Sequence, residues 1–358
     1  MSEKLLMKGN EAIAEAAIRA GCRHYFGYPI TPQTEIAHYM AKKMPKIGGV
    51  FLQAESEIGA INMVYGAASA GARVMTSSSS PGISLKQEGI SYIAGAELPA
   101  VIVNIVRCGP GLGGILPAQC DYFQAVKGGG HGDFRMVVLA PSSVQELYDL
   151  TVEAFDISDQ YRIMTMIMGD GILGQMMETV EFRESEEIAV YDRSWACTGT
   201  EMKRGKNVIT SIYINPEELE ALNQKLQAKY KVICEKETRV EEYHCDEAEI
   251  VIAAYGSVAR IAKNVIKMAE KEGIKVGLIR PVSLWPFPSE SFERIADNGH
   301  VKAFLSVEMS TGQMIEDVRL AVNGKKPVYF HGRQGGMIPV QDEVLSIIKE
   351  MINKEGKI

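Results

Sequence analysis

The sequence predicts an α/β protein in which a parallel sheet covered by helices is followed by a second, smaller α/β domain. Helical and strand patterns alternate along roughly the first 180 residues, as in βαβ units. A second alternation begins near residue 249. The length of 358 residues also suits two domains, at about 150 residues for each.

Each element of the first domain follows from its apolar pattern. Helices are expected where apolar residues recur every three or four positions, and strands where short apolar runs stand between turn residues. This predicts helices over 10–20, 33–43, 56–70, 83–94 and 143–158. It predicts strands over 22–26, 50–54, 73–76, 100–106, 136–140 and 164–168.

The pattern changes between 181 and 245, where charges cluster and the apolar period weakens around one helix, 216–230. We interpret this stretch as a connecting segment between domains at 1–180 and 246–358. The second domain is expected to contain strands over 249–254, 275–278, 303–308 and 327–330. Its helices are expected over 257–272, 289–297, 313–322 and 339–353, with a proline-rich turn at 280–288.

Composition excludes several classes of protein. Hydrophobic residues make up 46% of the chain, which is ample for globular cores, and the net charge of −7 disfavours nucleic acid or an anionic membrane as the main partner. The six cysteines form no C-x-x-C pair, which argues against an iron–sulfur or zinc site made by this chain alone. No signal pattern or run of about 18 apolar residues is present, so a cytoplasmic protein is expected.

Unusual loops follow four successive strands of the first domain. They are GYPITP at 27–32, ESE at 55–57, SSSSPG at 77–82 and RCGPGLGG at 107–114. The carboxyl ends of parallel strands meet at one edge of a sheet, where ligands bind. The sequence therefore predicts a functional site at this edge.

Two prolines constrain the first of these loops. Pro29 and Pro32 fix their own φ angles and favour extended conformations at Tyr28 and Thr31. This rigidity could aim the Thr31 hydroxyl at a ligand. Alternatively, Pro32 opens the next helix and Thr31 is its N-cap.

Glu57 lies in the first turn of a predicted helix whose apolar residues include Ile58, Ile61 and Tyr65. A carboxylate there could serve to complement the helix dipole, worth about 0.3–1 kcal/mol. Its place beside the other strand-end loops makes it instead a candidate for handling a proton in a cleft.

Arg107 follows an apolar run that is typical of a strand buried on both faces. It is either a surface cap or a bidentate ligand for a carboxylate or phosphate. The glycines after it allow close approach of the backbone. The neighbouring Cys108 has no partner in the sequence pattern.

Two motifs are discounted. The stretch 109–114 fits G-x-G-x-x-G, but Pro110 and the lack of an acidic residue at the end of a second strand argue against a dinucleotide site. Gly-Asp-Gly at 169–171 resembles a metal–diphosphate motif without its later asparagine. His131 and His331 stand alone, so no metal ligand is expected in this chain.

The motifs in order resemble those of the thiamine diphosphate-dependent 2-oxoacid:ferredoxin oxidoreductases, in the alpha-type chain that carries the pyrimidine-side domain. The matching segments of the first domain are 28–32, 56–60, 79–82, 107–114 and 140–146. The second domain resembles the transketolase C-terminal domain through 254–257, 280–288 and 307–313. The resemblance implies a thiamine diphosphate-binding parallel sheet domain followed by a transketolase C-terminal-like α/β domain.

The resemblance also implies roles for individual residues. Glu57 matches the glutamate that hydrogen-bonds N1′ of the cofactor's aminopyrimidine and so promotes loss of the C2 proton. Thr31 and Arg107 match residues that position the substrate's carboxylate and carbonyl. The residues implied to bind the cofactor, besides Glu57, are Tyr28, Pro29, Ile30, Ser79, Ser80 and Gly82.

Several partners are implied in the same way. A beta-type subunit would hold the diphosphate and Mg²⁺, and gamma- and delta-type subunits, one of them ferredoxin-like, would carry the iron–sulfur clusters. Ferredoxin would accept the electrons, coenzyme A would take the acyl group, and the assembled complex would form a dimer. The isolated chain would therefore hold half of a cofactor site.

The loop sequences SSSSPG and GPGLGG more closely resemble those of the branched-chain, 2-oxoisovalerate members of the family. The 2-oxoglutarate enzymes more often show T-x-x-S-G-P-G and G-P-S-T-G, and this chain departs from both; 2-oxoglutarate and aryl or simple 2-oxoacids are the alternative substrates. A non-catalytic assembly subunit and a nicotinamide-dependent dehydrogenase are the other functions considered.

Overall fold

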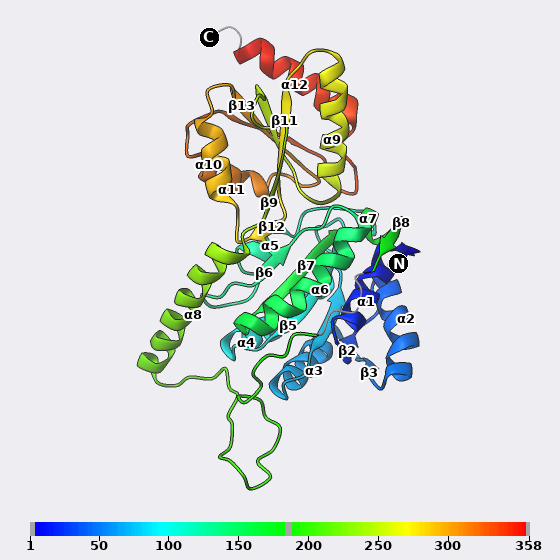
Figure 1. Cartoon of the computed structure of the whole chain (residues 1–358), viewed down its shortest axis with the longest axis vertical. Helices are drawn as coiled ribbons and strands as arrows, with labels where there is room; N and C mark the ends of the chain where they lie inside the picture. The colour runs from blue at the N-terminus through cyan, green and yellow to red at the C-terminus, as the bar shows by residue number, and fades with distance from the viewer. Residues whose placement is uncertain (1–3, 183–187, 356–358) are drawn as a thin grey trace.

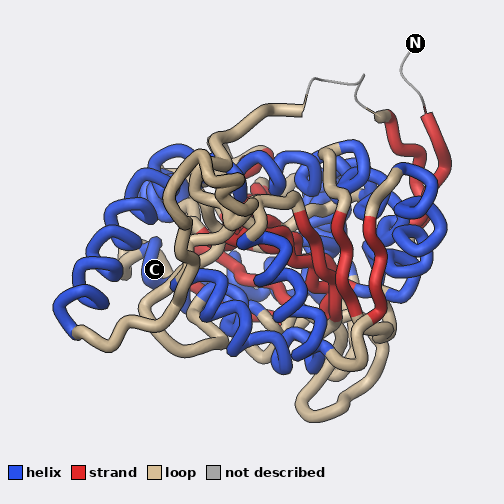
Figure 2. Tube along the Cα trace, turned by 90° about the horizontal axis from the view of Figure 1, so that it is seen from below, coloured by secondary structure: helices blue, strands red, loops and turns tan. Residues whose placement is uncertain are grey.

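The computed structural model describes residues 4–182 and 188–355. Two α/β units lie end to end along the long axis of the molecule, with the C-terminal unit uppermost in Figure 1. The strands of the described residues form a seven-stranded, a five-stranded and a two-stranded sheet. Figure 2, seen from below, shows strands running through the middle of the first unit with helices on both sides. The predicted α/β class with parallel sheets is confirmed.

The seven-stranded sheet has the order β12-β6-β7-β5-β4-β2-β3. Its pairs are parallel except for the one that joins β12 to β6. The strands are β2 (His24–Gly27), β3 (Val50–Gln53), β4 (Val74–Ser78), β5 (Ala100–Val106), β6 (Val137–Leu139), β7 (Met164–Asp170) and β12 (Ser283–Trp285).

Side-chain alternation along the strands divides the core of this unit into two layers. In β5, Val101, Val103 and Ile105 belong to one apolar cluster, whereas Ala100 and Ile102 belong to another. The first cluster is covered by α1 (Gly9–Arg19), α2 (Thr34–Lys43), α6 (Val144–Tyr161) and α8 (Pro216–Glu237). The second is covered by α3 (Glu57–Ser69), α4 (Pro81–Gly95) and α5 (Tyr122–Val126).

The five-stranded sheet has the order β14-β13-β10-β11-β9. Its strands are β9 (Val240–Tyr243), β10 (Ile250–Ala253), β11 (Val276–Pro281), β13 (Ala303–Glu308) and β14 (Val328–Gly332). Helices α9 (Gly256–Lys271) and α12 (Gln341–Glu355) pack on one face, and α10 (Ser289–Asp297) and α11 (Met314–Val322) on the other.

The predicted elements occur in the expected order, with bounds shifted by a few residues, but the sequence analysis missed several short ones. The expected turn at 280–288 contains β12, which joins the first sheet. The expected connecting segment contains β9, which joins the second. The other missed elements are β1 (Lys4–Lys8) paired with β8 (Met177–Glu181), the 3₁₀ helix η1 (Met44–Ile47), α5 and α7 (Gly171–Gln175).

The two units are joined by a polar interface. Gln119 bonds the second unit through its side-chain amide, which donates to Tyr255 O over 2.9 Å and accepts from Met309 N over 2.9 Å. Arg280 forms a two-pronged ion pair with Glu146, with both N–O distances 2.9 Å. One apolar cluster also contains residues of both sheets. These contacts hold the units in a defined relative position.

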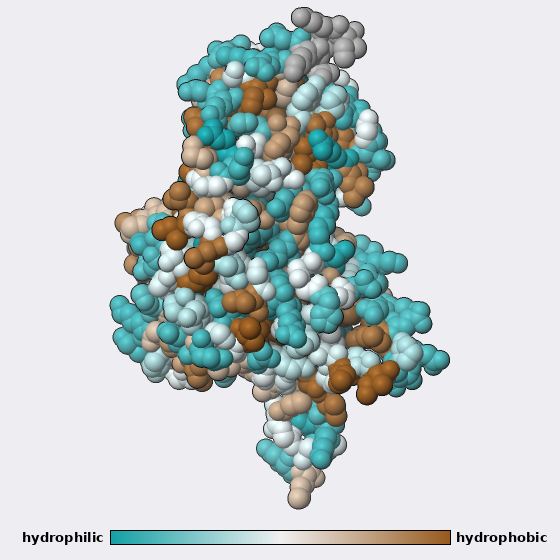
Figure 3. All heavy atoms as spheres, turned by 180° about the vertical axis from the view of Figure 1, so that it is seen from behind, coloured by the Kyte–Doolittle hydropathy of each residue, from teal (hydrophilic) through white to brown (hydrophobic). Residues whose placement is uncertain are grey.

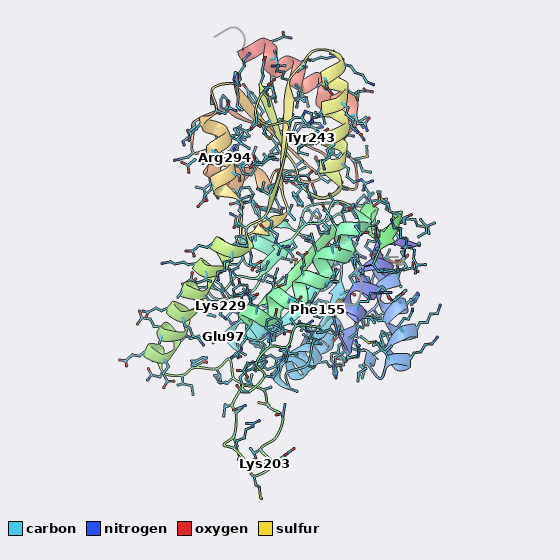
Figure 4. All side chains as sticks on the ribbon, in the orientation of Figure 1. Glu97, Phe155, Lys203, Lys229, Tyr243 and Arg294 are labelled. Carbon is cyan, nitrogen blue, oxygen red and sulfur yellow. The ribbon has the colours of Figure 1, made fainter. Side chains whose placement is uncertain are left out.

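Helix α8 packs on the first unit beneath this junction. Figure 4 shows Lys229 of α8 close to Glu97, and the two side chains form an ion pair of 2.8 Å. Before α8, residues 188–215 contain no helix or strand; Ala196 is buried against the first unit, whereas the part around Lys203 forms the loop at the bottom of Figures 1 and 4. No helix in the described part of the chain is long and apolar enough to cross a membrane.

Candidate active site

The four unusual loops lie at one edge of the first sheet. They follow β2, β3, β4 and β5, which run parallel and lie side by side in the sheet. Main-chain and side-chain contacts, described below, connect three of these loops directly and place the fourth against α4. The predicted gathering of these loops is confirmed.

Glu57 is the first residue of α3, at the end of the loop that follows β3. The preceding Ser56 caps the helix, since its hydroxyl accepts from Gly59 N over 3.1 Å. The Glu57 side chain is only 6% exposed, so it does not complement the helix dipole from solvent. It turns toward α4, where a Cβ added to Gly82 would lie 2.7 Å from Glu57 Oε1.

The end of β4 brings hydroxyl groups to the same place. Ser78 Oγ would lie 2.1 Å from that added Cβ, so the Ser78 hydroxyl and the Glu57 carboxylate approach the same point. The hydroxyls of Thr76, Ser78 and Ser79 are buried and have no hydrogen-bond partner among the described residues. Buried hydroxyls usually have partners, so this group is prepared for a polar ligand.

Ser80 connects this strand end to the next loop. Its hydroxyl donates to Arg107 O over 3.1 Å and accepts from Arg107 N over 3.0 Å. Its own amide donates to Asn104 Oδ1 over 3.2 Å. Helix α4 begins immediately afterward at Pro81, so 79–82 is the start of a helix rather than an isolated turn.

Arg107 is buried, with 7% of its surface exposed. Its Nη1 donates to Thr31 O and its Nη2 to Leu112 O, each over 3.0 Å. The guanidinium therefore holds the loops after β2 and β5 together instead of capping the surface. Its Nε is buried with no partner among the described residues, which leaves one donor of the fork for a ligand.

Thr31 is not a helix N-cap, so the alternative interpretation of its loop is wrong. Helix α2 begins at Thr34 with Gln33 in the N-cap position, and the Thr31–Pro32 peptide is cis. Gln33 is buried and its side chain instead accepts from Ser77 Oγ over 2.5 Å. Thr31 is exposed at the mouth of the site, where its carbonyl is the group that Arg107 binds.

The other predicted residues of this loop differ in exposure. Tyr28 and Ile30 are half-buried and Pro29 is exposed. Gln33 Nε2 donates to Tyr28 O over 3.3 Å, and Asn10 Nδ2 donates to Pro32 O over 2.7 Å. The loop is thus held by its backbone, with side chains left at the rim.

Sequence reasoning missed Lys86. It lies in α4, one turn after Gly82, the residue of that helix that meets Glu57. Its side chain is fully buried, and Nζ has no hydrogen-bond partner among the described residues. Burial lowers the pKa of Lys86 to about 8, and the charge of Glu57 acts in the opposite direction. No motif signalled it, because a lysine on an amphipathic helix is normally solvated.

Asp121 was missed as well. It is buried at the base of a cleft of about 610 Å³ between the two units, which Ser80, Arg107 and Cys108 also line. Burial raises the pKa of its carboxyl, although a hydrogen bond of 2.9 Å from Asn104 opposes this. The second unit completes the cleft with residues 309–311, 313, 334 and 335.

The discounted Gly-Asp-Gly motif has a structural role. Asp170 caps α7, since its carboxylate accepts from Ile172 N over 2.9 Å and from Leu173 N over 3.2 Å. Its other oxygen accepts from Ser257 Oγ of the second unit over 2.6 Å. No cluster of three His, Cys, Asp or Glu residues suited to a metal ion occurs in 4–182 or 188–355.

Comparison with known proteins identifies this arrangement. Residues 15–245 match the family described as pyruvate flavodoxin/ferredoxin oxidoreductase, thiamine diphosphate-binding, and residues 248–344 match the pyruvate:ferredoxin oxidoreductase core domain II. The chain belongs to this family. It is therefore a member of the thiamine diphosphate-binding 2-oxoacid oxidoreductases, as the order of its motifs predicts.

Individual relatives of this oxidoreductase chain extend over its whole length. It is 54% identical to the ketoisovalerate oxidoreductase subunit VorB of Methanothermobacter thermautotrophicus, over 97% of both chains. It is 36% identical to the 2-oxoglutarate synthase subunit KorA of Methanothermobacter marburgensis, over 98% of this chain and 100% of that one.

Solved structures give the same fold. The 2-oxoglutarate:ferredoxin oxidoreductase of Magnetococcus marinus superimposes with a TM-score of 0.88 at 26% identity, over 98% of this chain and 66% of that chain. A split-gene transketolase shares the fold alone, with a TM-score of 0.60 at 12% identity over 97% of this chain and 98% of that chain.

Proposed function

We propose that the chain is the alpha-type subunit of a 2-oxoacid:ferredoxin oxidoreductase that acts on 2-oxoisovalerate. The reaction is oxidative decarboxylation to an acyl-CoA and CO₂ with reduction of ferredoxin. The observation that carries the substrate assignment is the 54% identity to a ketoisovalerate oxidoreductase subunit, against 36% to a 2-oxoglutarate synthase subunit. The loop sequences SSSSPG and GPGLGG support the same choice.

The residues around Glu57 fit the aminopyrimidine of thiamine diphosphate. That ring presents nitrogen acceptors and an amino donor, and it needs partners of both kinds. The Glu57 carboxylate and the buried Ser78 hydroxyl, which approach the same point, provide them, and the buried Ser79 hydroxyl follows next in the chain. Gly82 keeps the approach to the carboxylate open, because a side chain there would collide with Glu57 and Ser78.

Glu57 is the proton-handling residue of the chain. When bound, thiamine diphosphate supplies a nucleophilic carbon for the 2-oxo group and an electron sink for decarboxylation. Glu57 holds a proton at N1′ of the pyrimidine, and its burial keeps water from competing for that bond. Tyr28, Pro29, Ile30 and Ser80 shape the rim and wall of the pocket.

Thr31 and Arg107 position the 2-oxoacid. Arg107 holds the carbonyl of Thr31 and so fixes the loop that presents the Thr31 hydroxyl at the mouth. The remaining donor of the guanidinium, Nε, is available to an anionic or carbonyl oxygen of the substrate. The two residues thus act as one unit.

Partner subunits complete the active site. We assign the diphosphate and Mg²⁺ to a beta-type subunit and the iron–sulfur clusters to gamma- and delta-type subunits, with coenzyme A as co-substrate and ferredoxin as acceptor. Exposed apolar side chains near the mouth support a covering subunit: Ile58, Leu85, Leu112, Ile115 and Leu116 are each about half exposed or more. Figure 3 shows brown, apolar patches on one face of the molecule, some of them near the junction of the two units.

The same proposal covers the domains and the compartment. We propose a pyrimidine-binding domain at 1–180, a connecting segment at 181–245 and a transketolase C-terminal-like domain at 246–358. All six cysteines lie within the described residues and are free thiols, which supports a reducing, cytoplasmic location.

The test is to co-purify the chain with its partner subunits and to measure coenzyme A-dependent reduction of a viologen dye. A panel of 2-oxoacids should show the highest kcat/KM for 2-oxoisovalerate. A clear preference for 2-oxoglutarate would overturn the substrate assignment. Reduction of a nicotinamide cofactor by a 2-hydroxyacid, or no turnover in an intact complex, would overturn the proposed activity.

A further inference from the structure

The buried lysine behind Glu57 has no place in the function proposed so far. Lys86 is fully buried in α4, and Nζ has no hydrogen-bond partner among the described residues. A buried ammonium is costly unless a charge or hydrogen bonds compensate it. Its presence therefore needs an explanation from its surroundings.

The packing of α3 against α4 places Lys86 on the face of α4 that meets Glu57. Gly82, Lys86 and Gly89 lie at i, i+4 and i+7, on one face of α4. A Cβ at Gly82 would touch the carboxylate of Glu57, and a Cβ at Gly89 would lie 2.5 Å from the side chain of Ile61. The face that contains Lys86 is therefore pressed against the first two turns of α3.

Strand β4 contributes uncharged hydroxyl groups to this layer. In β4, Val74, Thr76 and Ser78 alternate with Met75, which packs in the opposite core layer, so Thr76 and Ser78 face the α3–α4 layer. The hydroxyls of both residues have no hydrogen-bond partner within the part of the chain that the structure describes. Burial lowers the pKa of Lys86, and the charge of Glu57 raises it.

We propose that Lys86 is a positioning residue for Glu57: its buried ammonium is the counter-charge of the carboxylate and holds it at the floor of the pocket. The part of this inference that concerns turnover rests on the proposed function, whereas the pairing of the two charges does not. Ser78, the last residue of β4, approaches the same point beside Gly82 as the carboxylate, so its hydroxyl can transmit the interaction without direct contact of the two charges.

Unfolding of the full chain tests the pairing without the cofactor. The chain and its variants Lys86→Met, Glu57→Gln and Lys86→Met/Glu57→Gln are unfolded thermally at pH 7. Removing Lys86 should raise Tm by several degrees more in the Glu57→Gln background than in the wild type, because it then removes an uncompensated cation. Equal shifts in both backgrounds would overturn the pairing. Lys46→Met, at an exposed position, is the control and should shift Tm equally in both.

The pH dependence gives a second readout. The pKa of Lys86 is about 8 in the folded chain and near 10.5 in the unfolded chain. Between these pH values only the unfolded chain holds the proton, so the free energy of unfolding rises with pH over this range. Glu57→Gln should start this rise at a lower pH, because the charge of Glu57 raises the pKa of Lys86, and Lys86→Met should abolish it. If Lys86→Met does not fold, the Glu57→Gln shift decides, and an unshifted rise overturns the proposal.

The assembled complex tests the positioning role. Lys86→Met should lower kcat at least about tenfold while the KM for the 2-oxoacid changes by less than about threefold, because the substrate contacts are intact. Unchanged kcat would overturn the role in turnover. If Glu57→Gln also turned over normally while the unfolding experiment showed coupling, the proposed function would fail and the charge pairing would stand.

Discussion

The guanidinium of Arg107 binds the main-chain carbonyl of Thr31 over 3.0 Å and that of Leu112 over the same distance. One buried side chain thus joins the loop after β2 to the loop after β5, across the intervening β4. The hydroxyl of Ser80, just after β4, bonds to both the main-chain amide and the main-chain carbonyl of Arg107. The mouth of the site is therefore one connected structure rather than three separate loops.

Arg107→Lys should impair the enzyme although it keeps the charge. A lysine ammonium cannot reproduce the planar fork that reaches two carbonyls, and a hydrogen bond to a charged group is worth about 1.5–3 kcal/mol. We expect kcat/KM in the complex to fall at least about tenfold. Arg319→Lys, at an exposed position of α11, is the control and should leave it unchanged. A fully active Arg107→Lys variant would show that the fork is dispensable.

Gly82→Ala should close the pocket. The new Cβ would lie 2.1 Å from Ser78 Oγ and 2.7 Å from Glu57 Oε1, so one of these groups must move at a cost of about 1–3 kcal/mol. Thiamine diphosphate binding by the complex should weaken markedly. Gly66→Ala, in α3 with nothing within 4 Å, should instead stabilise the chain by about 0.5–1 kcal/mol. Wild-type cofactor affinity in Gly82→Ala would contradict the placement of the pocket.

Asp170 should make stability depend on pH. Burial raises the pKa of its carboxyl, so the folded chain holds the proton more tightly than the unfolded chain. The protonated Asp170 carboxyl contributes fully to stability below the ordinary aspartate pKa. This contribution is lost as pH rises through the pKa that Asp170 has in the folded chain. In urea unfolding between pH 4 and 7, the free energy of unfolding of Asp170→Asn should rise relative to that of the wild type as pH rises. The exposed Asp246→Asn should give a smaller slope; equal slopes would exclude Asp170 as the cause.

Leu112→Glu should weaken assembly. Leu112 is 80% exposed on the loop at the mouth, where we propose that a beta-type subunit binds. A buried, unpaired carboxylate in such an interface is costly, so we expect the affinity for the partner to fall at least about tenfold in a pull-down titration. Leu320→Glu, 75% exposed on α11, is the matched control. Equal affinities for both variants and the wild type would place the partner elsewhere.

The edge of the sheet was predictable from the sequence because it depends on chain order and apolar runs. The strand at Ala100–Val106 is apolar except for Asn104, and the residue after it, Arg107, had to lie at the carboxyl end. Glu57 was placed correctly in a first helical turn for the same reason. Periodicity therefore identified the location of the candidate site.

Contacts that depend on three-dimensional packing were not predictable. Lys86 follows a helical pattern that would normally place it in solvent, and its burial arises from glycines at 82 and 89 that let α3 approach. Strand β12 has only three residues and precedes a proline, so its local sequence resembles a turn. Its partner strand β6 lies 144 or more positions earlier in the sequence, so the pairing leaves no local signal. Thr31 matched an N-cap pattern. Instead the side chain of Gln33 accepts a hydrogen bond from Ser77 of β4, and helix α2 begins only at Thr34.

The central claim is that Glu57 is the proton-handling residue at the cofactor. Glu57→Gln is measured in the reconstituted complex by coenzyme A-dependent dye reduction with 2-oxoisovalerate, beside Glu55→Gln, which changes an exposed glutamate two residues earlier. We predict that Glu57→Gln lowers kcat by about 10²–10⁴-fold with the complex still assembled, while Glu55→Gln stays near wild type. Near-normal turnover by an assembled Glu57→Gln complex would contradict the claim.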